Sequence, residues 1–228
     1  YSAGNIALAM LQDANVTVFG TKEKWKMLGR SVPVSENGNG IHIFARSTFG
    51  KGYTLADAYD VRQTQGRPLK EVHLENDTRD MESAMTTLLN YAVCQVVIDK
   101  ELETPAVYDP QRMELAINPD YPDHEMFAAI ATAVAHSRLH GKGYNAQYDY
   151  AESDLDAQSV SYLLCRRFGV ERDLPDTAEL PALYDGWDAQ ERRQALDQIQ
   201  KMSKQIGASV EKSITPQRSR VPMQHNGR

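Results

Sequence analysis

The chain has 228 residues, which is enough for one large domain or two small ones. Its hydrophobic fraction of 41% and charged fraction of 25% are typical of soluble globular proteins, and no apolar run approaches the ~20 residues that span a bilayer. Both cysteines, Cys94 and Cys165, lie in apolar helical patterns, where a thiol usually fills the core. These features argue against membrane and disulfide-rich secreted proteins, so we expect a cytoplasmic protein with no membrane partner.

The net charge of −6 is unevenly distributed along the chain. Residues 1–70 contain nine Lys and Arg against five Asp and Glu, residues 211–228 contain four against one, and the segment between them is acidic. This asymmetry predicts two modules with different partners, although a solvated basic face without a partner would give the same counts. The first residues show neither an initiator Met nor a signal peptide, so we interpret the chain as a fragment of a larger protein.

The first 70 residues predict a small α+β module. Its expected elements are a helix at 6–11, a β-branched strand at 16–19, a short helix from the capping Thr21 to Gly29, and strands at 41–44 and 53–61. The Asn- and Gly-rich segment 37–40 is a predicted turn. The polar, irregular segment that begins at Gln65 predicts a module boundary near residue 70.

Residues 71–212 predict a mainly helical domain, which makes the fold class α+β. Its expected elements are a helix at 77–93, two β-prone pieces near 108–110 that pair with each other, and helices at 126–139, 155–168 and 189–210. Residues 213–228 contain two prolines and three arginines, and they predict a flexible basic tail.

The predicted helix at 126–140 carries two histidines, His136 and His140, four residues apart. In zincin metallopeptidases two histidines at this spacing bind zinc, a Glu beside the first is the general base, and a later helix supplies the third ligand. Residues 156–165 (Asp-Ala-Gln-Ser-Val-Ser-Tyr-Leu-Leu-Cys) resemble the acidic-Ala-x-Ser-Val-x-Tyr-x-x-Cys helix of zincin-like domains related to the ArdC and ImmA/IrrE families. The resemblance implies a zincin-like domain in which Asp156 takes the place of the third metal ligand.

In this register His136 takes the place of the second histidine, but Thr132 stands where the first belongs and Ala133 where the Glu belongs. Loss of the general base costs about 10²–10⁴ in rate, and loss of a ligand weakens metal binding. The resemblance therefore predicts a pseudoenzyme without catalytic residues or a required cofactor, whose metal positions His136, His140 and Asp156 are vacant. The alternative is a zinc-dependent metallohydrolase that uses these three residues in a nonstandard site.

Residues 1–66 resemble the N-terminal domain of ArdC-type antirestriction proteins. The resemblance is carried by Trp25 with Leu28-Gly29-Arg30, by Tyr59-Asp60-Val61, and by Gln63-Thr64-Gln65-Gly66. It implies single-stranded DNA binding in a bacterial protein of a plasmid, phage or conjugative element. The turn at 35–40, which is rich in Lys and Gly in the family, has no Lys in this chain.

Nonspecific binding of a single strand needs cations for the phosphates and exposed aromatic faces for the bases. The candidate nucleic-acid-binding residues are Lys24, Trp25, Lys26, Arg30, Arg46, Lys51, Arg62 and Gln63, with Tyr53 and Tyr59 as further aromatic candidates. For Trp25, core packing is the favoured alternative. We therefore expect a noncatalytic protein that binds nucleic acid or serves as a scaffold; a protein-interaction module without DNA binding is the alternative.

Overall fold

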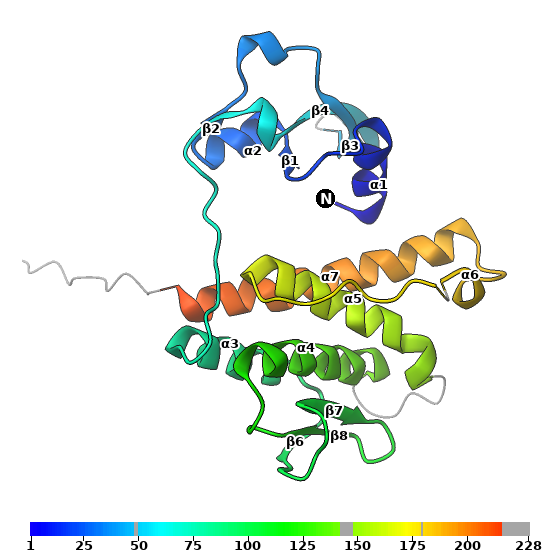
Figure 1. Cartoon of the computed structure of the whole chain (residues 1–228). Coiled ribbons are helices and arrows are strands. Elements are labelled where there is room, and N and C mark those ends of the chain that lie inside the picture. The colour runs from blue at the N-terminus through cyan, green and yellow to red at the C-terminus, as the bar shows by residue number, and fades with distance from the viewer. Residues whose placement is uncertain (48–49, 142–147, 179, 216–228) are drawn as a thin grey trace, which may run out of the picture. The chain divides into compact units, whose positions relative to one another are not determined.

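The computed structural model describes residues 1–47, 50–141, 148–178 and 180–215. They form an α+β fold with a mainly helical C-terminal part, which confirms the predicted fold class (Figure 1). The chain divides into two compact units. Unit 1 comprises Tyr1–Glu71 and Trp187–Gln200, and unit 2 comprises Val72–Gly186 and Lys201–Arg228. Of the predicted tail at 213–228, the first residues continue the last helix to Ile214, and residues 216–228 lie outside the described part of the chain.

Unit 1 contains short helices and two small sheets. Its elements are α1 (Ala3–Gln12), β1 (Phe19–Gly20), α2 (Lys22–Met27), β2 (Arg30–Ser31), the 3₁₀ turn Val34–Glu36, β3 (Ile41–Arg46), β4 (Tyr53–Asp60), the 3₁₀ turn Val61–Gln63 and β5 (Gln65–Gly66). One sheet has the antiparallel order β1-β4-β3, and β2 pairs with β5 in the other. The predicted strands at 41–44 and 53–61 correspond to the β3–β4 hairpin.

The core of unit 1 lies on one face of the β3–β4 hairpin. Because side chains alternate along a strand, Ile41 and Ile43 are buried against Ala9 of α1, while His42 and Phe44 point outward. Helix α1 also covers the edge of β3. Asn5 exchanges hydrogen bonds with the backbone N–H and C=O of Phe44 at 2.9 and 2.8 Å, and Gln12 does the same for His42. The edge of β3 has no neighbouring strand on this side, and these amide side chains make the hydrogen bonds that such a strand would make.

Unit 2 consists of helices and a small mixed sheet. Its elements are α3 (Arg79–Leu89), β6 (Gln95–Ile98), β7 (Ala106–Asp109), β8 (Glu114–Ile117), α4 (Asp123–His140), α5 (Tyr150–Phe168), α6 (Leu180–Leu183) and the C-terminal part of α7 (Ala189–Ile214). The sheet has the order β6-β8-β7, with β8 parallel to β6 and antiparallel to β7. Helix α3 ends at Leu89, earlier than predicted, because the chain must turn before it enters β6.

Helix α4 is the centre of unit 2, and it packs against α3, α5, β7 and β8 (Figure 1). Burial on several sides explains its apolar, alanine-rich sequence, since small side chains let neighbouring elements approach closely. At one end Phe127 meets Phe168 of α5 edge to face, with ring centroids 6.2 Å apart. Helix α5 is capped by Asp149 at its start and by Gly169 at its end, where a φ of 66° gives the left-handed conformation that glycine adopts readily. None of the helices in the described ranges is long and apolar enough to cross a membrane.

Candidate functional site

His136 is fully buried in unit 2, and both of its ring nitrogens have partners. Nδ1 lies 2.7 Å from the hydroxyl of Tyr148, and Nε2 lies 3.0 Å from a carboxylate oxygen of Asp154 at the start of α5. The ring of Tyr150 stacks on the imidazole, with centroids 3.9 Å apart and planes 11° apart. The histidine that the motif places at a metal is therefore enclosed by two tyrosines and a carboxylate.

The partners of His136 determine which nitrogen carries the proton. Burial lowers the pKa of His136, against the opposing effect of Asp154, so the ring is neutral at neutral pH. A carboxylate only accepts hydrogen bonds, so Nε2 carries the hydrogen and donates to Asp154. Nδ1 is then the acceptor. Burial raises the pKa of Tyr148, which keeps its phenol protonated and able to donate to Nδ1.

Thr132 and Ala133 line a cleft of about 460 Å³ in unit 2. The cleft is also bounded by Ala106 and Val107 of β7 and by Tyr150 and Asp154 of α5. The Thr132 hydroxyl donates to the backbone oxygen of Ala128 at 3.1 Å, one turn earlier in α4. Ala133 has no polar side-chain atom at all, so neither position offers an ionisable group to the cleft.

His140 belongs to the same aromatic cluster rather than to a ligand set. Its Nδ1 lies 2.6 Å from the hydroxyl of Tyr108 on β7, and its ring stacks on Tyr148 with centroids 4.5 Å apart. Tyr148 therefore lies between the two histidines, bonded to His136 and stacked on His140. Both histidines are buried and hydrogen-bonded within unit 2.

The structure brings Asp154, and not Asp156, to His136. Asp156 instead accepts a hydrogen bond of 3.2 Å from Tyr184, and burial raises its pKa. Two residues correspond to about 200° around a helix, so the two carboxylates point in nearly opposite directions. The sequence spacing is consistent with this choice. Asp154 lies seven residues, or about two turns, before Ser161, so the two residues share one face of α5. Ser161 faces α4, because its hydroxyl bonds the backbone oxygen of Ala128.

The side chains present do not fit a metal ion. A structural or catalytic zinc takes at least three protein ligands, and in the described ranges no group of three His, Cys, Asp or Glu side chains lies close enough to hold an ion. His136 and Asp154 are bonded to each other, and the second oxygen of Asp154 accepts from Gln158 at 2.6 Å. The three residues of the alternative site, His136, His140 and Asp156, each bond a different tyrosine: Tyr148, Tyr108 and Tyr184.

Two of the predicted nucleic-acid-binding residues in unit 1 hold the fold together. Trp25 is 1% exposed, and its Nε1 donates to the backbone oxygen of Tyr59 at 2.9 Å. Arg30 donates from Nε and Nη2 to the hydroxyl and backbone oxygen of Thr64, at 2.7 and 2.9 Å, and from Nη1 to the backbone oxygen of Arg67. Trp25 therefore has no face for a base, and Arg30 has most of its donors engaged.

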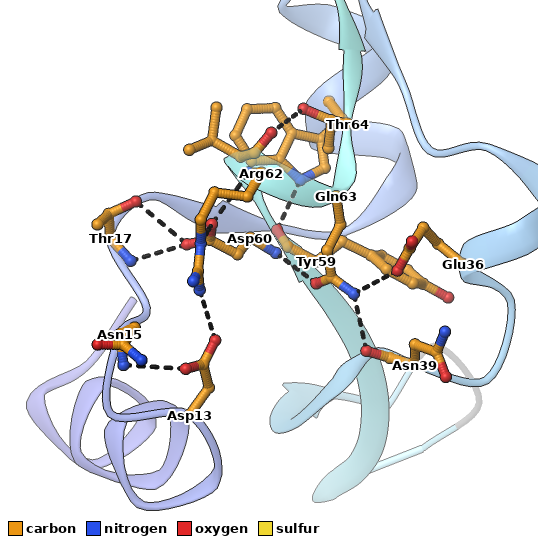
Figure 2. Close-up of polar contacts among 12 residues, drawn as sticks. Asp13, Asn15, Thr17, Glu36, Asn39, Tyr59, Asp60, Arg62, Gln63 and Thr64 are labelled. Carbon is orange, nitrogen blue, oxygen red and sulfur yellow. Dashed lines mark hydrogen bonds and ion pairs between the residues drawn. The ribbon is translucent and has the colours of Figure 1, made fainter.

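Arg62 and Gln63 belong to a polar network around the end of β4 (Figure 2). Arg62 pairs with Asp60 at 2.6 Å and with Asp13 at 2.5 Å. The Gln63 side chain accepts from the backbone N–H of Asp60, and the Asp60 side chain accepts from the backbone N–H of Gln63, which together form a capping box. Gln63 also donates to Glu36 at 2.7 Å. Burial raises the pKa of Asp60, but hydrogen bonds from Thr17 and Arg62 outweigh it and hold the pKa below its ordinary value.

The other candidates remain on the surface of unit 1. Lys24, Lys26, Arg46 and Lys51 are exposed, although the Lys24 ammonium lies 4.8 Å from the centroid of the Tyr1 ring. Tyr59 is buried, whereas Tyr53 is exposed. Phe44, which no sequence motif includes, is exposed on the same hairpin. The alternation of Ile41 and Ile43 with their neighbours is the sequence signal that identifies its outward position.

No protein-family model matches the chain, and no curated protein matches its sequence. Among solved structures, the chain is similar to the Mn(II)-bound antirestriction protein ArdC from the R388 plasmid, with 14% identity and a TM-score of 0.54. The metal-free structure of that protein gives 16% identity and a TM-score of 0.51. Each match covers 94% of this chain and 85% of the other. The predicted resemblance is thus confirmed at the level of the fold: the chain has the fold of the antirestriction protein ArdC.

Proposed function

We propose that the chain is a noncatalytic ArdC-like protein of a mobile genetic element, in which unit 1 binds single-stranded DNA and unit 2 is a degenerate metallopeptidase fold that acts as a scaffold. The observation that carries the noncatalytic half is the hydrogen bonding of His136, whose two ring nitrogens are engaged by Tyr148 and Asp154. The ArdC neighbour, an antirestriction protein from a plasmid, supports the mobile-element context.

Metal-dependent peptide hydrolysis requires an ion that activates water and a base that takes its proton. For His136 to ligate an ion through Nδ1, it would have to give up the Tyr148 hydrogen bond; through Nε2, it would have to give up Asp154. Thr132 offers a hydroxyl that already bonds the backbone, and Ala133 cannot take a proton. The ArdC neighbour is Mn(II)-bound, whereas among the described residues of this chain no group of three His, Cys, Asp or Glu side chains could hold an ion.

The DNA-binding half rests on the fold and on the surface chemistry of unit 1. Lys24, Lys26, Arg46 and Lys51 are exposed cations, and the acids Asp13 and Asp60 both pair with Arg62 within the same unit. Phosphate binding by a few exposed cations is nonspecific and weakens as salt is raised.

Two measurements on the purified chain test the proposal. Elemental analysis after dialysis is expected to find far less than one zinc or manganese per chain, and peptidase assays with either metal added are expected to show no turnover. Fluorescence anisotropy with a labelled single-stranded oligonucleotide is expected to show binding, with a slope of log K against log salt no steeper than about −3 for four phosphate contacts.

Different results overturn the two halves separately. One tightly held metal per chain together with proteolysis would refute the pseudoenzyme assignment. Absence of oligonucleotide binding at low salt would refute the DNA-binding half and favour a protein partner for unit 1, which affinity capture with the full chain would then identify.

A further inference from the structure

The outer face of the β3–β4 hairpin combines exposed rings with positive charge. In the antiparallel register Phe44 lies opposite Leu55, and Arg46 lies opposite Tyr53. Phe44, Tyr53 and Leu55 are 54%, 69% and 60% exposed. Since residues opposite one another point to the same face, Phe44 and Tyr53 are diagonal neighbours on one surface, with Cα atoms about 7–8 Å apart.

The charge on this surface is concentrated at one end of the hairpin. Arg46 ends β3, and Lys51 lies just before β4 begins. Within the described part of the chain, no ion pair joins either cation to an acidic side chain. The acidic residue Asp57 lies toward the other end of the hairpin, where it is 3.0 Å from Nδ1 of His42. The aromatic pair is therefore bordered by cations that are available to an anion.

From this arrangement we propose that the outer hairpin face, formed by Phe44, Arg46, Lys51, Tyr53 and Leu55, is the surface on which unit 1 binds single-stranded nucleic acid. Two bases stack on Phe44 and Tyr53, while Arg46 and Lys51 contact the phosphates beside them. The assignment rests on the proposed DNA-binding function and gives it a location. It also requires little sequence preference, because every base presents a π-face to an aromatic ring.

The chemistry of this face favours a single strand over a duplex. In a duplex the bases are stacked on one another and only their edges are accessible in the grooves, so Phe44 and Tyr53 would gain no stacking partner. A single strand exposes its bases beside its phosphates, which matches the adjacent rings and cations. The exposed rings also explain why the buried Trp25 is not needed for base contact.

The test compares a normal oligonucleotide with an abasic one that has the same phosphates and no bases. Wild-type protein is expected to bind the normal strand more tightly. The double variant F44A/Y53A is expected to lose about five- to 150-fold in affinity for the normal strand per stacked base and to bind the abasic strand like wild type. Unchanged binding to the abasic strand also shows that the variant is folded.

Matched variants separate stacking from charge. Tyr53→Phe keeps the ring and is expected to bind like wild type, and Val34→Ala, at a position 82% exposed outside the hairpin, serves as a surface control. Arg46→Gln is expected to lower the affinity for the normal and the abasic strand by the same factor. It should also reduce the slope of log K against log salt by about 0.7.

The outcomes distinguish this inference from the proposed function beneath it. If wild-type protein binds neither strand, DNA binding by unit 1 is refuted. If it binds both strands equally and F44A/Y53A changes nothing, DNA binding stands and the hairpin surface is refuted. A preference of wild type for duplex DNA over a single strand of the same length would also overturn the assignment of this face.

Discussion

Removal of one hydroxyl tests whether the tyrosine partner of His136 holds unit 2 together. Tyr148→Phe keeps the ring that stacks on His140 but deletes the donor that lies 2.7 Å from Nδ1 of His136. His136 is fully buried, so its acceptor nitrogen would lose its partner without gaining free access to bulk water. An unsatisfied buried acceptor costs about 1–3 kcal/mol. For a protein of this size, that corresponds to a lowering of Tm by about 3–10 °C.

The control for Tyr148→Phe is a second tyrosine hydroxyl in the same unit. Tyr121 donates to the backbone oxygen of Glu103 at 2.6 Å in an exposed position, where water replaces the lost bond, so Tyr121→Phe is expected to cost less than about 0.5 kcal/mol. Calorimetry gives Tm, and hydrogen exchange shows whether protection is lost in α4 and α5 rather than in unit 1. Equal stability of the two variants would refute the reasoning and would mean that water reaches His136.

Four further predictions concern other groups. Burial lowers the pKa of His136 below its unfolded value of about 6.5, so the stability that the neutral ring contributes is complete above that pH and is lost as the pH falls. His136→Gln should therefore make the urea-unfolding midpoint less dependent on pH between about pH 5 and pH 7. Arg62→Gln should raise the pKa of Asp60 measured by NMR, so that the stability this carboxylate contributes above its unfolded pKa becomes smaller. Trp25→Phe, which removes the buried Nε1 donor to the Tyr59 carbonyl and leaves a smaller ring in the core, should cost about 2 kcal/mol in unfolding free energy yet leave the oligonucleotide affinity of the folded protein unchanged. Gly66→Ala should lower Tm by several degrees, about 1–3 kcal/mol, because Gly66 has a φ of 139° and a Cβ there would lie 2.5 Å from the Gly29 backbone oxygen.

Local sequence patterns were enough to predict the main helices and the hairpin. The apolar spacing predicted helices that overlap α4 and α5, and the β-prone pieces near 108–110 correspond to β7 and β8. Strand β6 was missed because Ala92 and Val93 continue the helical periodicity of α3, whereas β6 exists through its parallel pairing with β8, about 20 residues later in the chain. A partner at that distance leaves no signal in a local window.

The candidate site was predictable in position but not in detail. Motif spacing located His136, yet it selected Asp156 where the structure brings Asp154. A motif gives the positions of residues along the chain. Which of two nearby carboxylates on α5 points at His136 depends on how α5 is rotated about its axis where it packs on α4. Tyr148 could not have been inferred, because it reaches His136 from the residues before α5 and no motif includes it.

The roles of the basic residues in unit 1 follow from which of their hydrogen-bond donors are already engaged. Arg62 and Arg30 each bond groups more than 30 residues away in the chain, so their guanidinium donors are occupied by the fold itself. Arg46 and Lys51 have no such partner in the described ranges, and they lie beside two exposed rings. The residue type alone therefore does not show whether an arginine or lysine bonds groups within the fold or is available to an external anion. The separating quantity is the distance to the nearest internal acceptor, and this distance supports the proposed hairpin surface over the Trp25 segment.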